Sequence, residues 1–248
     1  MKRLIALLLF MPGIALAVAL SPAEKALVSL DDNYTQRTTA MTMRLFYKND
    51  DEQRTADLEF FASGNDRSLI EVKNQGGRYL KLGDRLLIYS AASGGPVKLT
   101  GRIFERSFLG SAFSFADLMF PRSFADVYTG QITTSETISF IVPQGTGEAV
   151  EEHDCLVMTL TASRRRAPAY RKMIWIDREI EMVVREKDFA LSGRLLKTIE
   201  YGDFRKVKKR YYPAYLRAED PARGGVASEL FIDQAEFDRT LPAGIFNP

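Results

Sequence analysis

The chain has 248 residues, 46% of them hydrophobic, and carries 34 Lys and Arg against 32 Asp and Glu. This length allows one large domain or two small ones, and the near balance of charge excludes the strong global field typical of nucleic-acid-binding proteins. The only histidine, His153, excludes metal sites that need two or more imidazoles. The only cysteine, Cys155, excludes an internal disulfide.

The N-terminal segment has the pattern of a secretory signal peptide. Lys2 and Arg3 precede an apolar run that continues to Ala17, and small residues at positions −3 and −1 favour cleavage after Ala17 or Ala19. An uncleaved membrane anchor is the alternative, but the run is shorter than the roughly 20 residues that span a bilayer. We therefore expect residues 1–19 to be removed and residues 20–248 to fold as a single soluble domain in the periplasm of a two-membrane bacterium.

The residues after the signal peptide predict a helix and then a series of strands. Ser21 and Pro22 open a helix that continues to Leu30, and in 39–47 apolar and polar residues alternate with the period of a strand. Similar segments follow to the C-terminus, giving roughly eleven strands in a mainly β fold, as a meander that closes into a large sheet or barrel. The further predicted strands are 56–60, 67–73, 79–82, 86–89, 138–142, 155–162, 170–177, 180–186, 195–204, 210–218 and 227–234.

The segment 107–120 interrupts this pattern of strands. Ser114 is a suitable N-cap with Asp117 at the third helical position, which predicts a short helix with an approximate capping box. An apolar, glycine-containing insert of this kind either fills the core or forms a lid over a cavity, and the local pattern favours core filling.

Two basic clusters, at 164–166 and 205–210, could dock on anionic lipid headgroups or on an acidic partner. A solvated loop and a solvated strand face are the interpretation we favour. Cys155 lies in an apolar strand, where burial as a small hydrophobic side chain is favoured over a reactive thiol.

The sequence contains no recognisable catalytic motif. It has no Gly-x-Ser-x-Gly elbow, no phosphate-binding glycine loop and no dinucleotide fingerprint. A catalytic triad would depend on His153 alone, and its acidic neighbours indicate a charged turn before a strand. We therefore expect a protein with no catalytic residue, no metal and no cofactor.

Five short segments, taken in this order, carry a family resemblance: Asp66-Arg67-Ser68-Leu69-Ile70, 79–89, 107–114, Leu196-Lys197-Thr198 and 240–246. They resemble the LolA-like group of outer-membrane lipoprotein-sorting proteins, which is related to the carrier LolA and its receptor LolB. The sequence departs from the family pattern at Ala112, where an acid usually follows Gly-Ser, and this puts a polar role of that loop in doubt.

The resemblance implies an incomplete antiparallel β-barrel of about eleven strands with a helical lid, around an apolar cavity that holds acyl chains. It makes 107–120 a lid that carries Phe108 and Phe113. Methionine side chains in such a lining would adapt to the shape of a cargo. The candidate lining residues are Met41, Met43, Leu45, Leu58, Phe60, Leu80, Leu82, Trp175 and Met182.

The function implied is that of a periplasmic carrier, which shields acyl chains of a lipid or lipoprotein during transfer toward the outer membrane. It could also serve as an accessory subunit of a lipid-exporting transporter. We expect a monomer whose partners are acyl chains and an inner-membrane transporter or an outer-membrane receptor, and no nucleic acid. One alternative is a regulatory sensor that resembles RseB and binds a signalling protein or lipid. Another is an enzyme that uses His153 or the carboxylates.

Overall fold

The computed structural model describes residues 20–34, 37–49, 52–89, 95–119, 123–163 and 167–248. The predicted signal peptide and the basic cluster at 164–166 lie outside these residues. In the described part, no helix combines the length and the apolar character that crossing a membrane would require.

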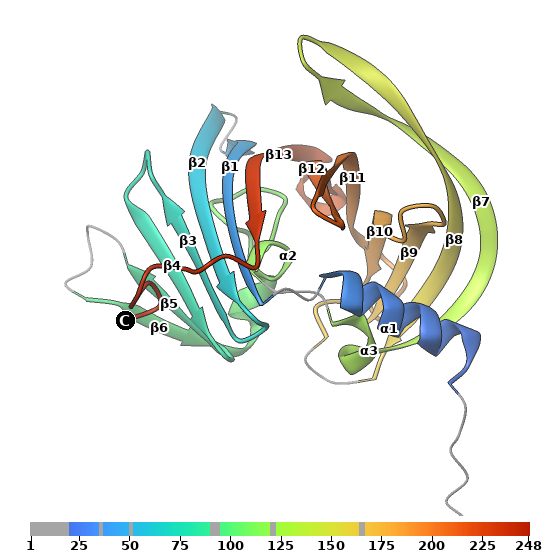
Figure 1. Cartoon of the computed structure of the whole chain (residues 1–248), viewed down its shortest axis with the longest axis horizontal. Helices are drawn as coiled ribbons and strands as arrows, with labels where there is room; N and C mark the ends of the chain where they lie inside the picture. The colour runs from blue at the N-terminus through green and yellow to red at the C-terminus, as the bar shows by residue number, and fades with distance from the viewer. Residues whose placement is uncertain (1–19, 35–36, 50–51, 90–94, 120–122, 164–166) are drawn as a thin grey trace, which may run out of the picture.

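Within the described residues, thirteen strands form one antiparallel sheet, and short helices cover its inner face (Figure 1). The helices are α1 (Pro22–Tyr34), α2 (Phe115–Met119) and α3 (Phe124–Val127), with 3₁₀ turns η1 (Gly101–Glu105) and η2 (Pro221–Arg223). The strands are β1 (Thr38–Asn49), β2 (Glu52–Ser63), β3 (Arg67–Val72), β4 (Gly77–Leu82), β5 (Arg85–Tyr89), β6 (Val97–Thr100), β7 (Tyr128–Gln144), β8 (Gly147–Ala162), β9 (Arg171–Asp177), β10 (Val183–Phe189), β11 (Leu195–Val207), β12 (Arg210–Asp220) and β13 (Val226–Phe237).

The strand order is β6-β5-β4-β3-β2-β1-β13-β12-β11-β10-β9-β8-β7, so β6 and β7 are edges and the sheet is not closed. The chain builds β1 to β6 outward, continues at the opposite edge with β7, and returns strand by strand until β13 pairs with β1. The predicted mainly β, incompletely closed fold is confirmed. The number predicted, roughly eleven, is below the number observed, and the strand without a predicted counterpart is β6, which is short and mostly exposed and shows no alternation.

Two capping boxes fix the starts of helices. In α1, the backbone N–H of Ser21 donates to Glu24 Oε2 at 2.7 Å, and the N–H of Glu24 donates to Ser21 Oγ at 3.2 Å. In α2, the N–H of Ser114 donates to Asp117 Oδ2 at 2.6 Å, and the N–H of Asp117 donates to Ser114 Oγ at 3.3 Å. The helix predicted from Ser114 and Asp117 is therefore confirmed.

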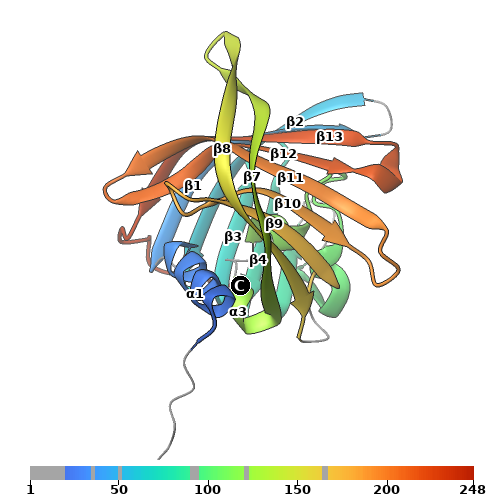
Figure 2. The ribbon, with the colours of Figure 1, turned by 90° about the vertical axis from the view of Figure 1, so that its right-hand side faces the viewer.

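The apolar side chains form two clusters, on opposite faces of the sheet. The main cluster lies on the inner face and includes Leu27 and Leu30 of α1 and Phe124 of α3. The second lies under the long β7–β8 hairpin, which extends past the neighbouring strands (Figure 2). The hairpin approaches β11 so closely that a Cβ at Gly202 would clash with Val142.

His153 of the second cluster lies between two carboxylates. Its Nδ1 is 2.7 Å from Asp177 Oδ2 and its Nε2 is 3.4 Å from Glu151 Oε2, while its ring stacks on Phe140. Burial lowers the pKa of the imidazole, but the two carboxylates raise it by more, so this pKa lies above its ordinary value. The contact between His153 of β8 and Asp177 of β9 therefore helps to hold the hairpin to the rest of the sheet.

We expect this interaction to make stability depend on pH. A raised folded-state pKa means that its contribution is fully present below the unfolded pKa of roughly 6.5 and is lost as pH rises through the folded value. The free energy of unfolding of the wild type, relative to the His153→Gln variant, should thus be higher at about pH 6 than at about pH 9. Urea denaturation across this range measures it, and a constant difference would contradict the assignment.

Candidate functional site

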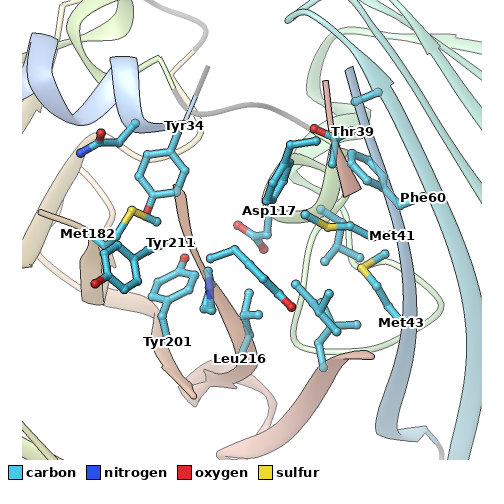
Figure 3. A pocket seen from close by; sticks show the side chains of 18 of the residues that line it. Tyr34, Thr39, Met41, Met43, Phe60, Asp117, Met182, Tyr201, Tyr211 and Leu216 are labelled. Atoms are coloured by element: carbon cyan, nitrogen blue, oxygen red, sulfur yellow. The ribbon is translucent and has the colours of Figure 1, made fainter. Parts of the chain in front are cut away.

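A cavity of about 190 Å³ opens on the inner face of the sheet, beside α1 and α2 (Figure 3). Tyr34, Tyr201 and Met182 line one wall, and Met41 and Met43 line the other. The remaining lining residues are Asn33, Thr39, Phe60, Ala62, Gly64, Asp117, Leu118, Tyr211, Tyr212, Pro213, Leu216, Leu230, Ile232 and Phe237. Most of these residues are aliphatic, aromatic or methionine, which suits an apolar ligand of variable shape.

The C-terminal end of α1 is attached across this cavity to the start of β10. Asn33 Nδ2 donates to the backbone oxygen of Glu181 at 3.1 Å, and the N–H of Val183 donates to the hydroxyl of Tyr34 at 3.3 Å. These two hydrogen bonds hold the helix at the edge of the cavity.

The structure brings four of the nine predicted lining residues together around the cavity: Met41, Met43, Phe60 and Met182. Leu45 and Leu58 are buried in the same main cluster without lining the cavity. That any of these residues contacts a ligand stays a prediction.

The other three predicted residues are not brought to the cavity, because side chains alternate between the two faces of a strand. Trp175 belongs to the second cluster, on the outer face of β9. Tyr79 of β4 packs against the main cluster, so Leu80 and Leu82 lie on the opposite face. The C-terminal tail is attached to this outer face, since Arg78 donates to the backbone oxygens of Ile245 and Asn247 at 3.1 and 2.9 Å.

Phe108 and Phe113, predicted on a lid, are both fully buried in the main cluster. The ring of Phe108 makes edge contacts with Tyr79 and Phe115, at centroid distances of 5.2 and 5.3 Å. From the same segment, Leu118 and Asp117 line the cavity. The segment thus covers the inner face, and its opening as a lid stays a prediction.

Ala112, where the family pattern usually has an acid, is buried, and its backbone N–H donates to Ser228 Oγ at 2.9 Å. The contact ties the loop before α2 to β13.

Asp117 is the only charged side chain among the described residues that line the cavity, and its carboxylate points into it (Figure 3). It accepts a hydrogen bond from Lys197 Nζ, which also donates to Ser114 Oγ at 3.3 Å. Burial raises the pKa of Asp117, but Lys197 and the backbone N–H of Ser114, with a smaller effect of Lys172, together lower it by more, so the pKa lies below its ordinary value. The carboxylate is therefore ionised at neutral pH.

A buried charge cluster continues from Lys197 across the inner face. Lys197 of β11 pairs in register with Asp188 of β10. Lys172 of β9 binds Asp188 Oδ1 at 2.6 Å and Glu186 Oε1 at 3.4 Å. Burial lowers the pKa of Lys172, but the two carboxylates raise it above its ordinary value. Cations and carboxylates thus alternate from β9 to α2.

These observations do not identify a catalytic or metal centre. Among the residues that the structure describes, no group of three or more His, Cys, Asp or Glu side chains is placed to hold a metal ion. Cys155 is fully buried, as the sequence predicted, and burial raises the pKa of its thiol to about 12. The thiol is thus protonated and inaccessible.

Sequence reasoning missed the tyrosines of the cavity and the buried charges. Tyr201 lies in the predicted strand 195–204, and Tyr212 and Leu216 lie at alternating positions of the predicted strand 210–218. These positions indicate burial. Which face they share with Met41 follows only from the pairing of β13 with β1. No prediction was made for Lys172, Glu186 and Asp188, because nothing local distinguishes a buried ion pair from an exposed one.

Comparison with solved structures shows a LolA-like fold. A LolA superfamily protein from Nitrosomonas europaea has a TM-score of 0.70 and 20% identity, with 92% of this chain and 99% of that chain covered. An outer membrane lipoprotein-sorting protein domain from Vibrio parahaemolyticus gives 0.74 and 16%, with 91% and 96% covered. A DUF1329 family protein from Desulfovibrio piger gives 0.76 and 16%, with 90% and 95% covered.

No curated protein matches the sequence. Residues 64–248, more than half of the chain, match a protein-family model that carries the description "uncharacterized protein". The chain therefore belongs to the family that this model defines, and it has the fold of the LolA-like proteins.

Proposed function

We propose that this protein is a periplasmic carrier that binds the acyl chains of a lipid or lipoprotein in the inner cavity and shields them during transfer toward the outer membrane. The observation that carries the proposal is the cavity lined by methionine, tyrosine and aliphatic side chains on the inner face of a LolA-like sheet. The signal peptide predicted in residues 1–19 supports export. An inner-membrane transporter would load the carrier, or an outer-membrane receptor would unload it.

The mechanism is reversible burial, with no covalent step. Each methylene moved out of water contributes roughly 0.8 kcal/mol to the free energy of binding. The bound acyl chain, which cannot cross an aqueous compartment on its own, is thereby shielded from water. Release requires a lining that tolerates both an occupied and an empty state. Flexible thioethers such as Met41, Met43 and Met182 provide it, since methionine repacks with little strain.

Filling the cavity should abolish binding. Ala62 is buried in the cavity wall, and Ala62→Phe places an aromatic ring in the space proposed for the acyl chain. We expect the affinity for a fluorescent fatty acid to fall by at least about tenfold, equivalent to roughly 1.4 kcal/mol. Fluorescence titration measures this, and native mass spectrometry of protein purified from periplasm should show a bound lipid in the wild type only.

The matched control is Val150→Phe, which adds the same ring at a position that is 71% exposed on the β7–β8 hairpin. It should bind as the wild type does. Absence of fatty-acid binding by the wild type, or equal binding by Ala62→Phe, would overturn the carrier proposal.

A further inference from the structure

A second, polar cavity of about 390 Å³ adjoins the apolar one, and we call it the vestibule. The two cavities share Asn33, Met182 and Tyr211, so the vestibule lies at the edge of the apolar cavity. The other residues that line it are Asp32, Glu179, Ile180, Glu181, Lys209 and Arg210. An apolar compartment beside a charged one matches the two parts of an amphiphile.

The charges of the vestibule come from separate elements. Lys209 and Arg210 lie at the turn between β11 and β12, whereas Asp32 lies on α1 and Glu179 and Glu181 lie in the turn before β10. The basic and the acidic side chains of the vestibule therefore come from different elements.

The charged groups of the vestibule differ in whether the protein itself pairs them. Arg210 is 3.7 Å from Asp238. Among the described residues, Asp32, Glu179, Glu181 and Lys209 form no ion pair. Charges that do not satisfy one another across a cavity remain able to bind a ligand.

The balance of charge indicates the class of ligand. A purely anionic headgroup would be repelled by the three carboxylates, and a purely cationic one would be repelled by Lys209 and Arg210. A headgroup with both a phosphate and an ammonium can place each charge against its opposite, which charge-assisted hydrogen bonds favour.

We propose that the vestibule binds the zwitterionic headgroup, phosphate plus ammonium, of an amphiphile whose acyl chain occupies the apolar cavity. Lys209 and Arg210 bind the phosphate, and Glu179, Glu181 and Asp32 bind the ammonium. This assignment rests on the proposed carrier function and adds the chemical class of the cargo.

The test compares lipids that differ only in the headgroup. Myristoyl lysophosphatidylethanolamine, lysophosphatidylglycerol and free myristate compete against one fluorescent fatty acid on the full-length mature protein. We expect the ethanolamine lipid to compete about tenfold better than the other two. Lys209→Gln, and separately Glu179→Gln with Glu181→Gln, should each reduce this preference about three- to tenfold and leave competition by myristate unchanged.

Matched controls carry the same change of charge outside the vestibule. Lys208→Gln alters the neighbouring exposed lysine of the same turn, and Glu148→Gln with Glu152→Gln removes two exposed carboxylates from β8. Both should keep the wild-type preference.

The possible failures are distinguishable. If fatty acid binds but all headgroups compete equally, or if lysophosphatidylglycerol is preferred, the vestibule assignment is overturned while the carrier function stands. If the controls lose the preference as strongly as the vestibule variants do, the assignment is also overturned. If no probe binds, both proposals are wrong.

Discussion

Replacing Lys172 by methionine is expected to lower the free energy of unfolding by about 3–5 kcal/mol. The side chain of Lys172 is 8% exposed, and those of its partners Glu186 and Asp188 are 3% and 7% exposed. Removal of the cation leaves two carboxylates close together with little access to water, and the cost of their desolvation is no longer offset. Urea denaturation of wild type and variant measures the difference.

Lys73 provides a matched control, because it also binds two carboxylates. Its Nζ is 2.9 Å from Glu59 and 2.9 Å from Glu71, but its side chain is 48% exposed. Lys73→Met should cost no more than about 1 kcal/mol, since exposed ion pairs contribute little. Equal losses in the two variants would mean that the Lys172 cluster is hydrated in solution, contrary to the structure.

The fold could be predicted from the sequence because most strands bury one face more than the other. In β1, Met43, Leu45 and Tyr47 are buried and alternate with exposed residues, so the period of two was visible. In β7, the half before Ile138 is largely exposed and only the distal half alternates clearly. The prediction of 138–142 therefore recovered less than a third of that strand.

The candidate site could be predicted only in part, because a local pattern does not say which face of a strand points inward. Met41 and Met43 were assigned to the cavity, and their strand lies at its wall. Trp175 is as buried as Met43, but its face is covered by the β7–β8 hairpin. That hairpin folds over β11 through contacts distant in sequence, such as the hydrogen bond from Asp203 N–H to Glu151 Oε1 at 3.0 Å. The periodicity of the sequence does not predict such a contact.

Phe108→Ala is expected to lower the free energy of unfolding by about 3–5 kcal/mol, the usual cost of deleting a buried phenyl ring. The ring is fully buried, and its neighbours Tyr79 and Phe115 are held in turn by β4 and α2. The site therefore cannot collapse to fill the space. Chemical denaturation measures the loss, paired with fatty-acid displacement on the same preparations.

Phe46→Ala is the control, because Phe46 also makes an edge contact with another ring, Phe231 at 5.5 Å, but is 36% exposed. Phe46→Ala should lower the free energy of unfolding by about 1 kcal/mol, since the variant mainly loses an aromatic pair at the surface.

Measuring stability and acyl-chain affinity on the same variants distinguishes a fixed segment from a movable one. A lid that stands open in the unliganded protein leaves Phe108 solvated, so Phe108→Ala would then weaken acyl binding and change stability by less than about 1 kcal/mol. That result would contradict the burial seen in the structure. A large loss of stability instead fixes Phe108 as core, and any opening over the cavity must then come from residues beyond it, at Asp117 and Leu118, where the segment lines the cavity.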